Sequence, residues 1–228
     1  MNRRLEAIMA HIPQNGRGVI DVGTDHGYLP AALFQRGYTG KLIAADINAE
    51  PLSKAKRTAE SIGAEDVISL RLCDGLDGCD PSEVDTIVIA GMGGDTICGI
   101  LDRAEWCMDA RYLLILQPMT KAEILRYWLV NNGFAIEQEH LLRDAGETYQ
   151  LFTARFGGET KLCDAELFAG CYPLVRSQPL FPEYLDALIR RFEKAIGGMG
   201  RAKRAIGRMA LNEEILRELY KMREDMQK

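Results

Sequence analysis

Four aspartates in the first third of the chain could act together in chemistry. Asp21, Asp46 and Asp74 each end or follow a segment typical of a β-strand, and Asp25 lies in a glycine turn after the first of these segments. Carboxylates at the carboxyl ends of parallel strands can accept hydrogen bonds from a ligand or balance a positive charge. One such acid alone could equally cap a helix or bind turn amides. Four acids at one sheet edge favour a ligand site.

The turn that contains Asp25 indicates the charge of that ligand. Its sequence, DVGTDHGYLP at 21–30, sets Gly23 and Gly27 between a strand and a helix, which lets the backbone close on a nucleotide-like cofactor. A carboxylate at Asp25 would repel a pyrophosphate. S-adenosylmethionine has no phosphate and carries a sulfonium and an ammonium, so the acidic turn favours this methyl donor over a dinucleotide.

The predicted donor-binding residues come from this turn and from the ends of the neighbouring strands. They are Asp21, Gly23, Thr24, Asp25, Gly27, Asp46, Ile47, Asp74, Gly75, Ala90, Gly91, Met92 and Gly93. Met92 is the only bulky side chain of its glycine loop, which suits the wall of a pocket.

The elements that must position these residues alternate between strand and helix. The expected strands are 19–22, 42–46, 67–73, 86–90 and 112–116, and the expected helices are 3–11, 28–36, 50–62, 95–101 and 121–131. We expect a glycine loop at 91–94, and we expect Gln117-Pro118 to stop the fifth strand. Such alternation, with uninterrupted apolar strands, predicts a parallel sheet covered by helices on both faces.

Two further strands, 134–142 and 148–156, follow with no helix between them and predict a hairpin at the end of the sheet. A parallel sheet closed by an antiparallel strand is typical of the seven-stranded doubly wound sheet of Rossmann-like methyltransferases. The predicted fold class is therefore α/β.

The pattern of apolar strands ends at Phe156 and only helical patterns follow, which predicts a second domain. The expected boundary is Gly157-Gly158-Glu159, between a methyltransferase domain at 1–156 and a helical domain at 157–228. Apolar residues at three- and four-residue steps predict two helices, 181–196 and about 202–226, that fold back as a coiled-coil hairpin. From residue 177 onward there are 11 Lys and Arg against 8 Asp and Glu, although the chain carries a net charge of −5. This tail could dock an anionic polymer, or it could be a solvated helical surface.

Composition excludes several other classes. The six cysteines have no two-residue spacing and only three histidines accompany them, so we expect reduced thiols, no metal site and a cytoplasmic protein. No apolar run reaches the roughly 18 residues of a membrane span, and the N-terminus lacks a signal-peptide core. An apolar content of 47% and a charged content of 27% are typical of globular proteins.

Four motifs together resemble those of the bacterial tRNA (adenine-22-N1)-methyltransferases. They are DVGTDHGYLP at 21–30, IAGMGG at 89–94, LQP at 116–118 and GF at 133–134. The resemblance covers about residues 1–156, and the helical tail is similar in kind to the family's C-terminal domain. It implies S-adenosylmethionine as the donor, N1 of an adenine in tRNA as the acceptor, and the tail as a tRNA-docking element.

The GMGG segment at 91–94 bears on which nitrogen is methylated. Amino-directed DNA methyltransferases carry an Asp/Asn-Pro-Pro-aromatic motif at this position, so its absence argues against exocyclic amines. N1 of adenine has an in-plane lone pair and needs no deprotonation. Asp25 is the candidate catalytic residue, since a carboxylate near the methyl would stabilise the cationic product base or accept a proton from N6. The alternative is that Asp25 only binds the ammonium of the donor.

The candidates for contact with the acceptor come from the turn, the fifth strand and the tail. They are His26, Tyr28, Gln117, Arg190, Arg191, Lys194, Arg201, Lys203, Arg204 and Arg208. Packing could explain Tyr28, and hydrogen bonding within the turn could explain His26. Two other functions stay open, a methyltransferase for another RNA or a small molecule and a non-catalytic protein that binds the donor or RNA. A monomer and a coiled-coil-mediated dimer are both compatible with the sequence.

Overall fold

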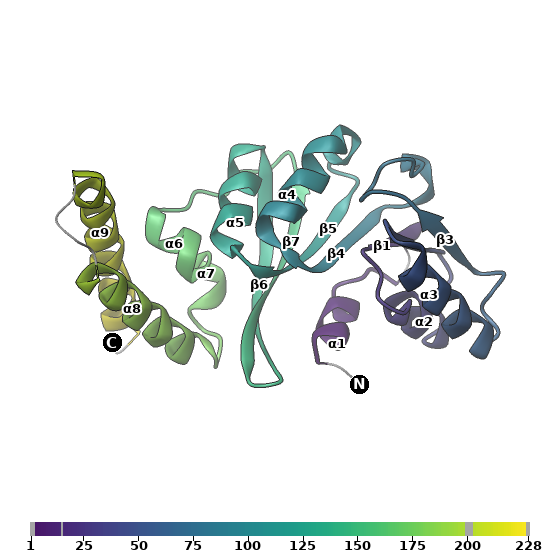
Figure 1. Cartoon of the computed structure of the whole chain (residues 1–228), viewed down its shortest axis with the longest axis horizontal. Helices are drawn as coiled ribbons and strands as arrows, with labels where there is room; N and C mark the ends of the chain where they lie inside the picture. Colours follow the sequence, from purple (N-terminus) through teal and green to yellow (C-terminus); the bar gives the residue numbers. More distant parts are fainter. Residues whose placement is uncertain (1–2, 15, 199–202, 227–228) are drawn as a thin grey trace.

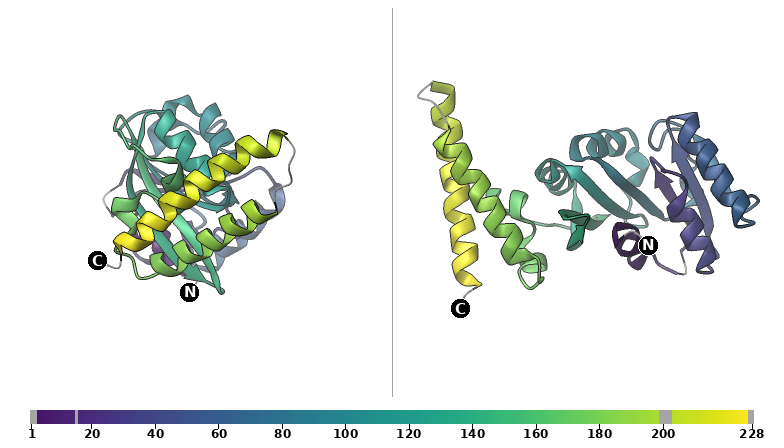
Figure 2. Two further views of the ribbon diagram at one scale, coloured as in Figure 1. Left: turned by 90° about the vertical axis from the view of Figure 1, so that its left-hand side faces the viewer. Right: turned by 60° about the horizontal axis from the view of Figure 1, so that its bottom comes forward.

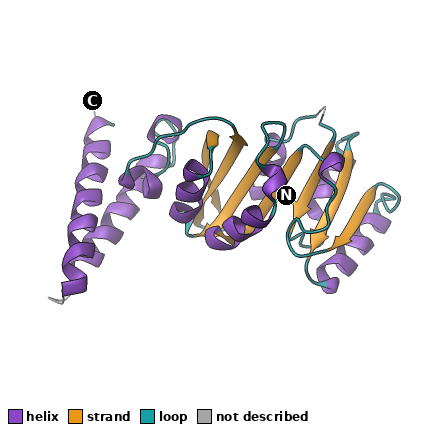
Figure 3. Ribbon diagram, turned by 90° about the horizontal axis from the view of Figure 1, so that it is seen from above, coloured by secondary structure: helices purple, strands orange, loops and turns teal. Residues whose placement is uncertain are grey.

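A seven-stranded sheet forms the centre of the protein in a computed structural model that describes residues 3–14, 16–198 and 203–226. The strands are β1 (Gly18–Val22), β2 (Lys41–Asp46), β3 (Ile68–Leu72), β4 (Thr86–Gly93), β5 (Leu113–Thr120), β6 (Phe134–Asp144) and β7 (Glu147–Phe156). Their spatial order is β3-β2-β1-β4-β5-β7-β6, with β7 antiparallel to both neighbours. Figure 3 shows the strands side by side. The predicted fold class is confirmed.

Helices cover both faces of this sheet, as the uninterrupted apolar strands predict. They are α1 (Arg3–Ala10), α2 (Tyr28–Gln35), α3 (Ala49–Ser61), α4 (Gly94–Arg103) and α5 (Ala122–Asn131), with 3-10 turns at Pro81–Glu83 and Glu105–Cys107. The core on one face includes Ile97 of α4 and Leu125 of α5. The core on the other face includes Ile8 of α1 and Leu33 of α2. Figure 1 shows α4 and α5 above the strands and α1 and α2 below them. Side chains from successive strand positions therefore fill both faces.

The C-terminal helices form a third apolar cluster. They are α6 (Asp164–Ala169), α7 (Tyr172–Val175), α8 (Phe181–Gly197) and α9 (Lys203–Asp225). Leu185 and Ile189 of α8 pack in one cluster with Ile215 and Leu219 of α9, and Leu141 of β6 joins them. Figure 2 shows α8 and α9 side by side at the end of the molecule remote from α2 and α3. The predicted helical hairpin is confirmed, whereas α6 and α7 are too short to have produced a periodic pattern.

Two boundaries predicted from the sequence are wrong. The segment 91–93 continues β4 instead of forming a loop, and β5 passes through Gln117 and Pro118 to Thr120. Met92 pairs with Pro118, with register shifts on both sides of this pair. A proline lacks an N–H group and is tolerated in a sheet at such a bulge, so it does not have to end the strand.

Candidate active site

The turn between β1 and α2 is fixed by backbone hydrogen bonds to the neighbouring strand. The N–H groups of Gly23 and Thr24 both donate to the carbonyl of Ala45 on β2, at 2.8 and 2.9 Å. Gly23 and Gly27 have φ angles of 73° and 65°, in the left-handed region that favours glycine, and His26 adopts it at 58°. This conformation turns the chain at the carboxyl edge of the sheet, where open α/β sheets bind ligands.

A cavity of about 530 Å³ lies beyond the ends of β1, β2 and β4, and we call it the larger cavity. Its volume falls within the roughly 300–1,000 Å³ of small-molecule sites. It brings together eight predicted donor-binding residues, Gly23, Asp46, Ile47, Asp74, Gly75, Ala90, Gly91 and Met92. The predicted convergence of strand ends on one pocket is therefore present in the structure.

Arg103 of α4 also lines the larger cavity and was not predicted from the sequence. Its Nη2 lies 2.8 Å from Oδ1 of Asp74 and its Nε lies 3.4 Å from Asp77. One oxygen of Asp74 is thus engaged by a cation, and Oδ2 is the oxygen left to accept from a ligand. Arg103 and Asp74 lie 29 residues apart, so no local spacing signals the pair.

A second cavity of about 200 Å³, the smaller cavity, adjoins the larger one. The two share Gly23, Ala90 and Gly91 in their walls. The smaller cavity also contains the predicted residues Asp21, Asp25, Tyr28 and Gln117. Helix α1 closes one side with Arg4, Leu5 and Ile8, which were not predicted from the sequence as site residues. Two ligands bound in these cavities would meet at the shared wall.

Asp21 gives the smaller cavity an excess of negative charge. The pKa of Asp21 is raised to about 6, mainly because the carboxyl is buried; a hydrogen bond from Thr24 lowers the pKa, and the nearby carboxylates of Asp46 and Asp25 raise it. That hydrogen bond runs from the Thr24 hydroxyl to Oδ2 of Asp21 at 2.6 Å. A cationic ligand group would relieve this unfavourable burial of charge.

Asp25 and its neighbours form the rim of the smaller cavity. The Asp25 side chain is 80% exposed, and its Oδ1 lies 3.5 Å from Nε2 of His26. The His26 ring stacks on the ring of Tyr28 with parallel planes and centroids 5.1 Å apart. Tyr28 is 54% exposed, so interior packing does not account for it. The rim therefore offers a carboxylate and an accessible aromatic face.

Gln117 occupies the opposite wall, near the end of β5. The side chain is buried, and its Nε2 donates to the carbonyl of Pro118 at 2.9 Å. This bond leaves Oε1 as the acceptor that the side chain can present to the smaller cavity.

Three predicted donor-binding residues line neither cavity: Thr24, Gly27 and Gly93. Thr24 acts through its hydrogen bond to Asp21. Gly27 packs against α3, since a Cβ atom there would lie 2.9 Å from the Cβ of Ala55. For Thr24 and Gly27 these contacts support a structural role.

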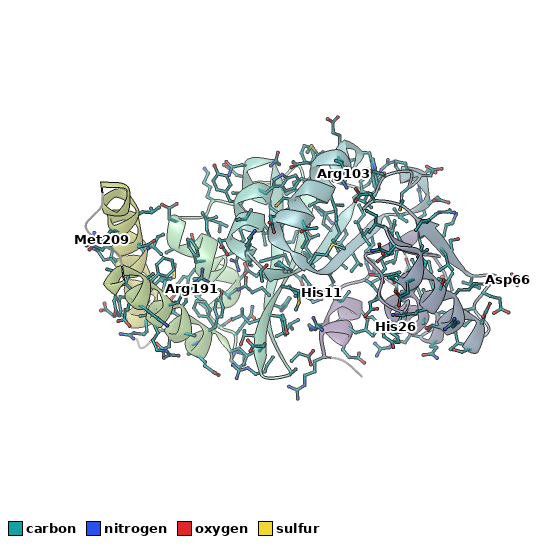
Figure 4. The ribbon with its side chains drawn as sticks, in the orientation of Figure 1. His11, His26, Asp66, Arg103, Arg191 and Met209 are labelled. Carbon is teal, nitrogen blue, oxygen red and sulfur yellow. The ribbon has the colours of Figure 1, made fainter. Side chains whose placement is uncertain are left out.

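The predicted tail residues are only partly covered by the structure. Arg190, Arg191 and Lys194 are exposed on α8. Arg201 lies outside the described residues, as do the side chains of Lys203, Arg204 and Arg208. Figure 4 shows Arg191 and His26 on opposite sides of the β6–β7 hairpin. Of the tail residues whose side chains the structure describes, Arg190, Arg191 and Lys194 line neither cavity.

The structure offers no alternative chemistry based on a metal or a membrane within its described residues. Over 3–14, 16–198 and 203–226, no group of three or more His, Cys, Asp or Glu could hold a metal ion. Each of the six cysteines is a free thiol. Among the helices of these same ranges, none combines the length and the apolar content needed to cross a bilayer.

Comparison with known proteins identifies the family. A family model described as a methyltransferase domain matches residues 1–152. The chain belongs to this methyltransferase family. A Bacillus subtilis tRNA (adenine(22)-N(1))-methyltransferase is 36% identical over 157 residues, which make up 69% of this chain and 66% of the B. subtilis protein. The matched segment thus spans just under two thirds of that relative's length.

Solved structures of methyltransferases match over nearly the whole chain. The B. subtilis M1A22 tRNA methyltransferase superimposes with a TM-score of 0.88 at 26% identity, covering 98% of each chain. A Streptococcus pneumoniae protein in complex with S-adenosyl-L-methionine superimposes with a TM-score of 0.80 at 30% identity, covering 95% of this chain and 99% of the other. The resemblance to the tRNA (adenine-22-N1)-methyltransferases is confirmed, and it includes the helical tail.

Proposed function

We infer that this protein transfers a methyl group from S-adenosylmethionine to N1 of adenine 22 in tRNA. The observation that carries the inference is the pair of cavities that meet at Gly23, Ala90 and Gly91. A donor in one cavity and a base in the other would face each other across that wall. The similarity to the B. subtilis enzyme supports tRNA as the acceptor.

The residues of the larger cavity fit the nucleoside of the donor. Asp46 ends β2, where a carboxylate can accept hydrogen bonds from ribose hydroxyls. Gly91 has a φ of 80° and open space beside it, which allows a ligand to approach the backbone closely. Asp21 lines the smaller cavity, which shares a wall with the larger one, and from there it offers its negative charge to the ammonium group. S-adenosylmethionine supplies an electrophilic methyl carbon attached to a positively charged sulfur.

The protein acts mainly by alignment and charge. N1 of adenine presents its lone pair without losing a proton, so the site needs to hold the ring in line with the methyl carbon, a contribution of several kcal/mol. Oε1 of Gln117 accepts a hydrogen bond from the amino group of the base and orients the ring. The carboxylate of Asp25, at the rim, stabilises the positive charge that the base acquires. In this assignment Asp25 serves the acceptor and Asp21 serves the donor.

We assign residues 1–156 to the catalytic domain and 157–228 to a domain that docks tRNA. Arg190, Arg191 and Lys194 lie exposed on α8, without ion-pair partners among the described residues. Such cations contact phosphates and make binding sensitive to salt. The bacterial tRNA pool lies in the cytoplasm, so we place the protein there.

Mass spectrometry of tRNA treated with the protein and S-adenosylmethionine tests the function. We expect 1-methyladenosine at position 22, and we expect no product from a control tRNA with guanine at that position. Methylation of a different RNA, or at a different atom, would identify the acceptor as wrong. Donor binding with no methyl transfer to any RNA would contradict the enzymatic assignment.

A further inference from the structure

A third cavity lies where the helical tail meets the catalytic domain, and we call it the junction cavity. Its volume is about 180 Å³. Its walls come from the end of β5 and the start of α5, from the first residues of β7, and from α6 and α8. Its lining includes Met119, Lys121, Glu123, Tyr149, Tyr184 and Arg191. This size is below the roughly 300–1,000 Å³ of drug-sized pockets and suits a small group.

We propose that the junction cavity binds one backbone phosphate of the tRNA strand that carries the target adenosine, with Arg191 as its cation. The proposal rests on the proposed function, because a tRNA acceptor brings a chain of phosphates past the smaller cavity. It separates Arg191 from Arg190 and Lys194, which contact phosphates farther along the RNA.

The junction cavity and the smaller cavity share a thin wall. Met119 lines the junction cavity, and its sulfur lies 3.8 Å from Nε2 of Gln117, which lines the smaller cavity. Tyr149 also lines the junction cavity, and the guanidinium of Arg4 lies 4.8 Å from the centroid of its ring. Arg4 itself lines the smaller cavity. A nucleotide whose base enters the smaller cavity therefore carries its neighbouring phosphates close to the junction cavity.

Charge at the junction cavity favours an anion on the side of α8. Arg191 has no ion-pair partner within the described ranges, whereas Lys121 lies 2.5 Å from the carboxylate of Asp95. Glu123 of α5 is the acid in the lining of the cavity. The phosphate must therefore bind beside Arg191 and away from Glu123, and Glu123 is expected to weaken its binding.

Buried hydrogen bonds hold the α8 wall of the cavity in place. The hydroxyl of Tyr184 donates to the carbonyl of Phe168 at 2.8 Å and accepts from the Gln150 amide. Oε1 of Gln150 accepts from Nη2 of Arg126 at 2.7 Å. Tyr184 lies two helical turns before Arg191, on the same face of α8. Anchoring Tyr184 thus fixes the position of Arg191, which lowers the entropic cost of binding a phosphate.

Neutral variants of two tail arginines separate this site from general attraction to the tail. Arg191→Gln removes the proposed contact, and Arg217→Gln is the matched control, since Arg217 is an exposed arginine of α9 that does not line the cavity. We expect Arg191→Gln to weaken tRNA binding about tenfold and to reduce the slope of log Kd against log salt by about one. We expect Arg217→Gln to stay within about twofold of the wild type. Equal losses in both variants, or none in Arg191→Gln, would overturn the proposal.

A second measurement locates the phosphate. A series of synthetic tRNAs is prepared, each with a single uncharged methylphosphonate at a different linkage around adenosine 22. The affinity of each tRNA is measured for the wild type and for Arg191→Gln. At one linkage the wild type should lose about tenfold in affinity, while Arg191→Gln should lose nothing further, because the contact is already absent. The Glu123→Gln variant should bind unmodified tRNA more tightly. If the methylphosphonate at each linkage lowers the tRNA affinity of both proteins equally, Arg191 contacts no backbone phosphate near adenosine 22.

Two controls keep this proposal separate from the proposed function. The affinity for S-adenosylmethionine and the thermal unfolding midpoint should be the same in Arg191→Gln, Arg217→Gln and the wild type. If the wild type methylates tRNA and Arg191→Gln binds tRNA as well as the wild type does, only the phosphate site is wrong. If the wild type methylates no tRNA, the function itself is wrong.

Discussion

Arg126 of α5 and Glu139 of β6 form an ion pair that is almost completely enclosed, with exposed fractions of 0% and 1%. The pair lies between the sheet and the helical tail. Arg126 also donates to the carbonyl of Leu167, and the second oxygen of Glu139 accepts from the N–H of Cys171 at 2.9 Å. The catalytic domain and the tail are therefore joined by a buried polar network as well as by apolar contacts.

Removing one partner of this pair should be costly. Arg126→Met leaves the Glu139 carboxylate buried without its cation, so we expect a loss of about 3–5 kcal/mol in the free energy of unfolding. Arg223→Met is the matched control, because it breaks an exposed pair with Asp186 and should cost at most about 1 kcal/mol. Urea unfolding measures both. Equal effects would mean that the enclosed pair contributes no more than a surface pair.

Asp21→Asn should stabilise the protein in the absence of ligand. Because the pKa of Asp21 rises from 3.8 to about 6 on folding, the native state favours the protonated carboxyl. That contribution is complete below about pH 4 and is lost as the pH rises through 6. At neutral pH we expect the variant to gain about 1–3 kcal/mol, and the gain should vanish below pH 4. Its affinity for S-adenosylmethionine should fall. If the stability difference between the variant and the wild type is the same at pH 7 and at pH 4, this account is contradicted.

Asp25→Asn should lower the rate of methyl transfer about a hundredfold if its carboxylate stabilises the cationic base. The side chain is exposed, so neither folding nor donor affinity should change appreciably. Single-turnover kinetics and calorimetric titration with the donor measure the two effects. A large rise in the dissociation constant of the donor with an unchanged rate would instead make Asp25 a donor-binding residue.

Gln117→Met should reduce recognition of the amino group of adenine. We expect kcat/KM for tRNA to fall about tenfold, since one hydrogen bond to the base is lost, while donor affinity is kept. A tRNA with purine in place of adenine 22 provides the control, because purine lacks the amino group. The wild type should discriminate against this tRNA and the variant should not. Discrimination that persists in the variant would assign recognition to another residue.

Gly27→Ala separates packing from donor binding. The new Cβ would lie 2.9 Å from Ala55 and would occupy a backbone with φ of 65°, so we expect a loss above about 1 kcal/mol. Gly63→Ala is the control, because φ there is 68° but nothing lies within 4 Å. The difference between the two variants in thermal unfolding reports the contact between α2 and α3. If Gly27→Ala lowers the free energy of donor binding by more than it lowers the free energy of unfolding, Gly27 belongs to the donor site.

Local patterns were sufficient to predict most of the fold. Apolar runs such as 42–46 predict strands buried on both faces, and the step of three to four residues in 181–196 predicts a helix. The two consecutive strands at 134–142 and 148–156 indicated the antiparallel end of the sheet. The same patterns could not predict that β4 and β5 continue together past Pro118, because that pairing depends on a bulge between two strands.

The cavities could be predicted only where residues adjoin strand ends. Asp46 and Gly91 were found because the carboxyl ends of parallel strands meet at one edge. Arg4 and Arg103 were missed, since each reaches its cavity from a helix and through contacts distant in the sequence. Arg126 was missed for the same reason, because its partners on β6, β7 and α6 become neighbours only in the folded chain.

The position of β7 has a consequence for how the protein is made. β7 is the last strand of the sheet to be synthesised, yet it pairs with both β5 and β6 in the interior of the sheet. Until residue 156 has left the ribosome, β5 must remain an open edge with unpaired backbone groups and an apolar surface. The sheet can therefore close only late in translation, when the helices that follow are already being synthesised.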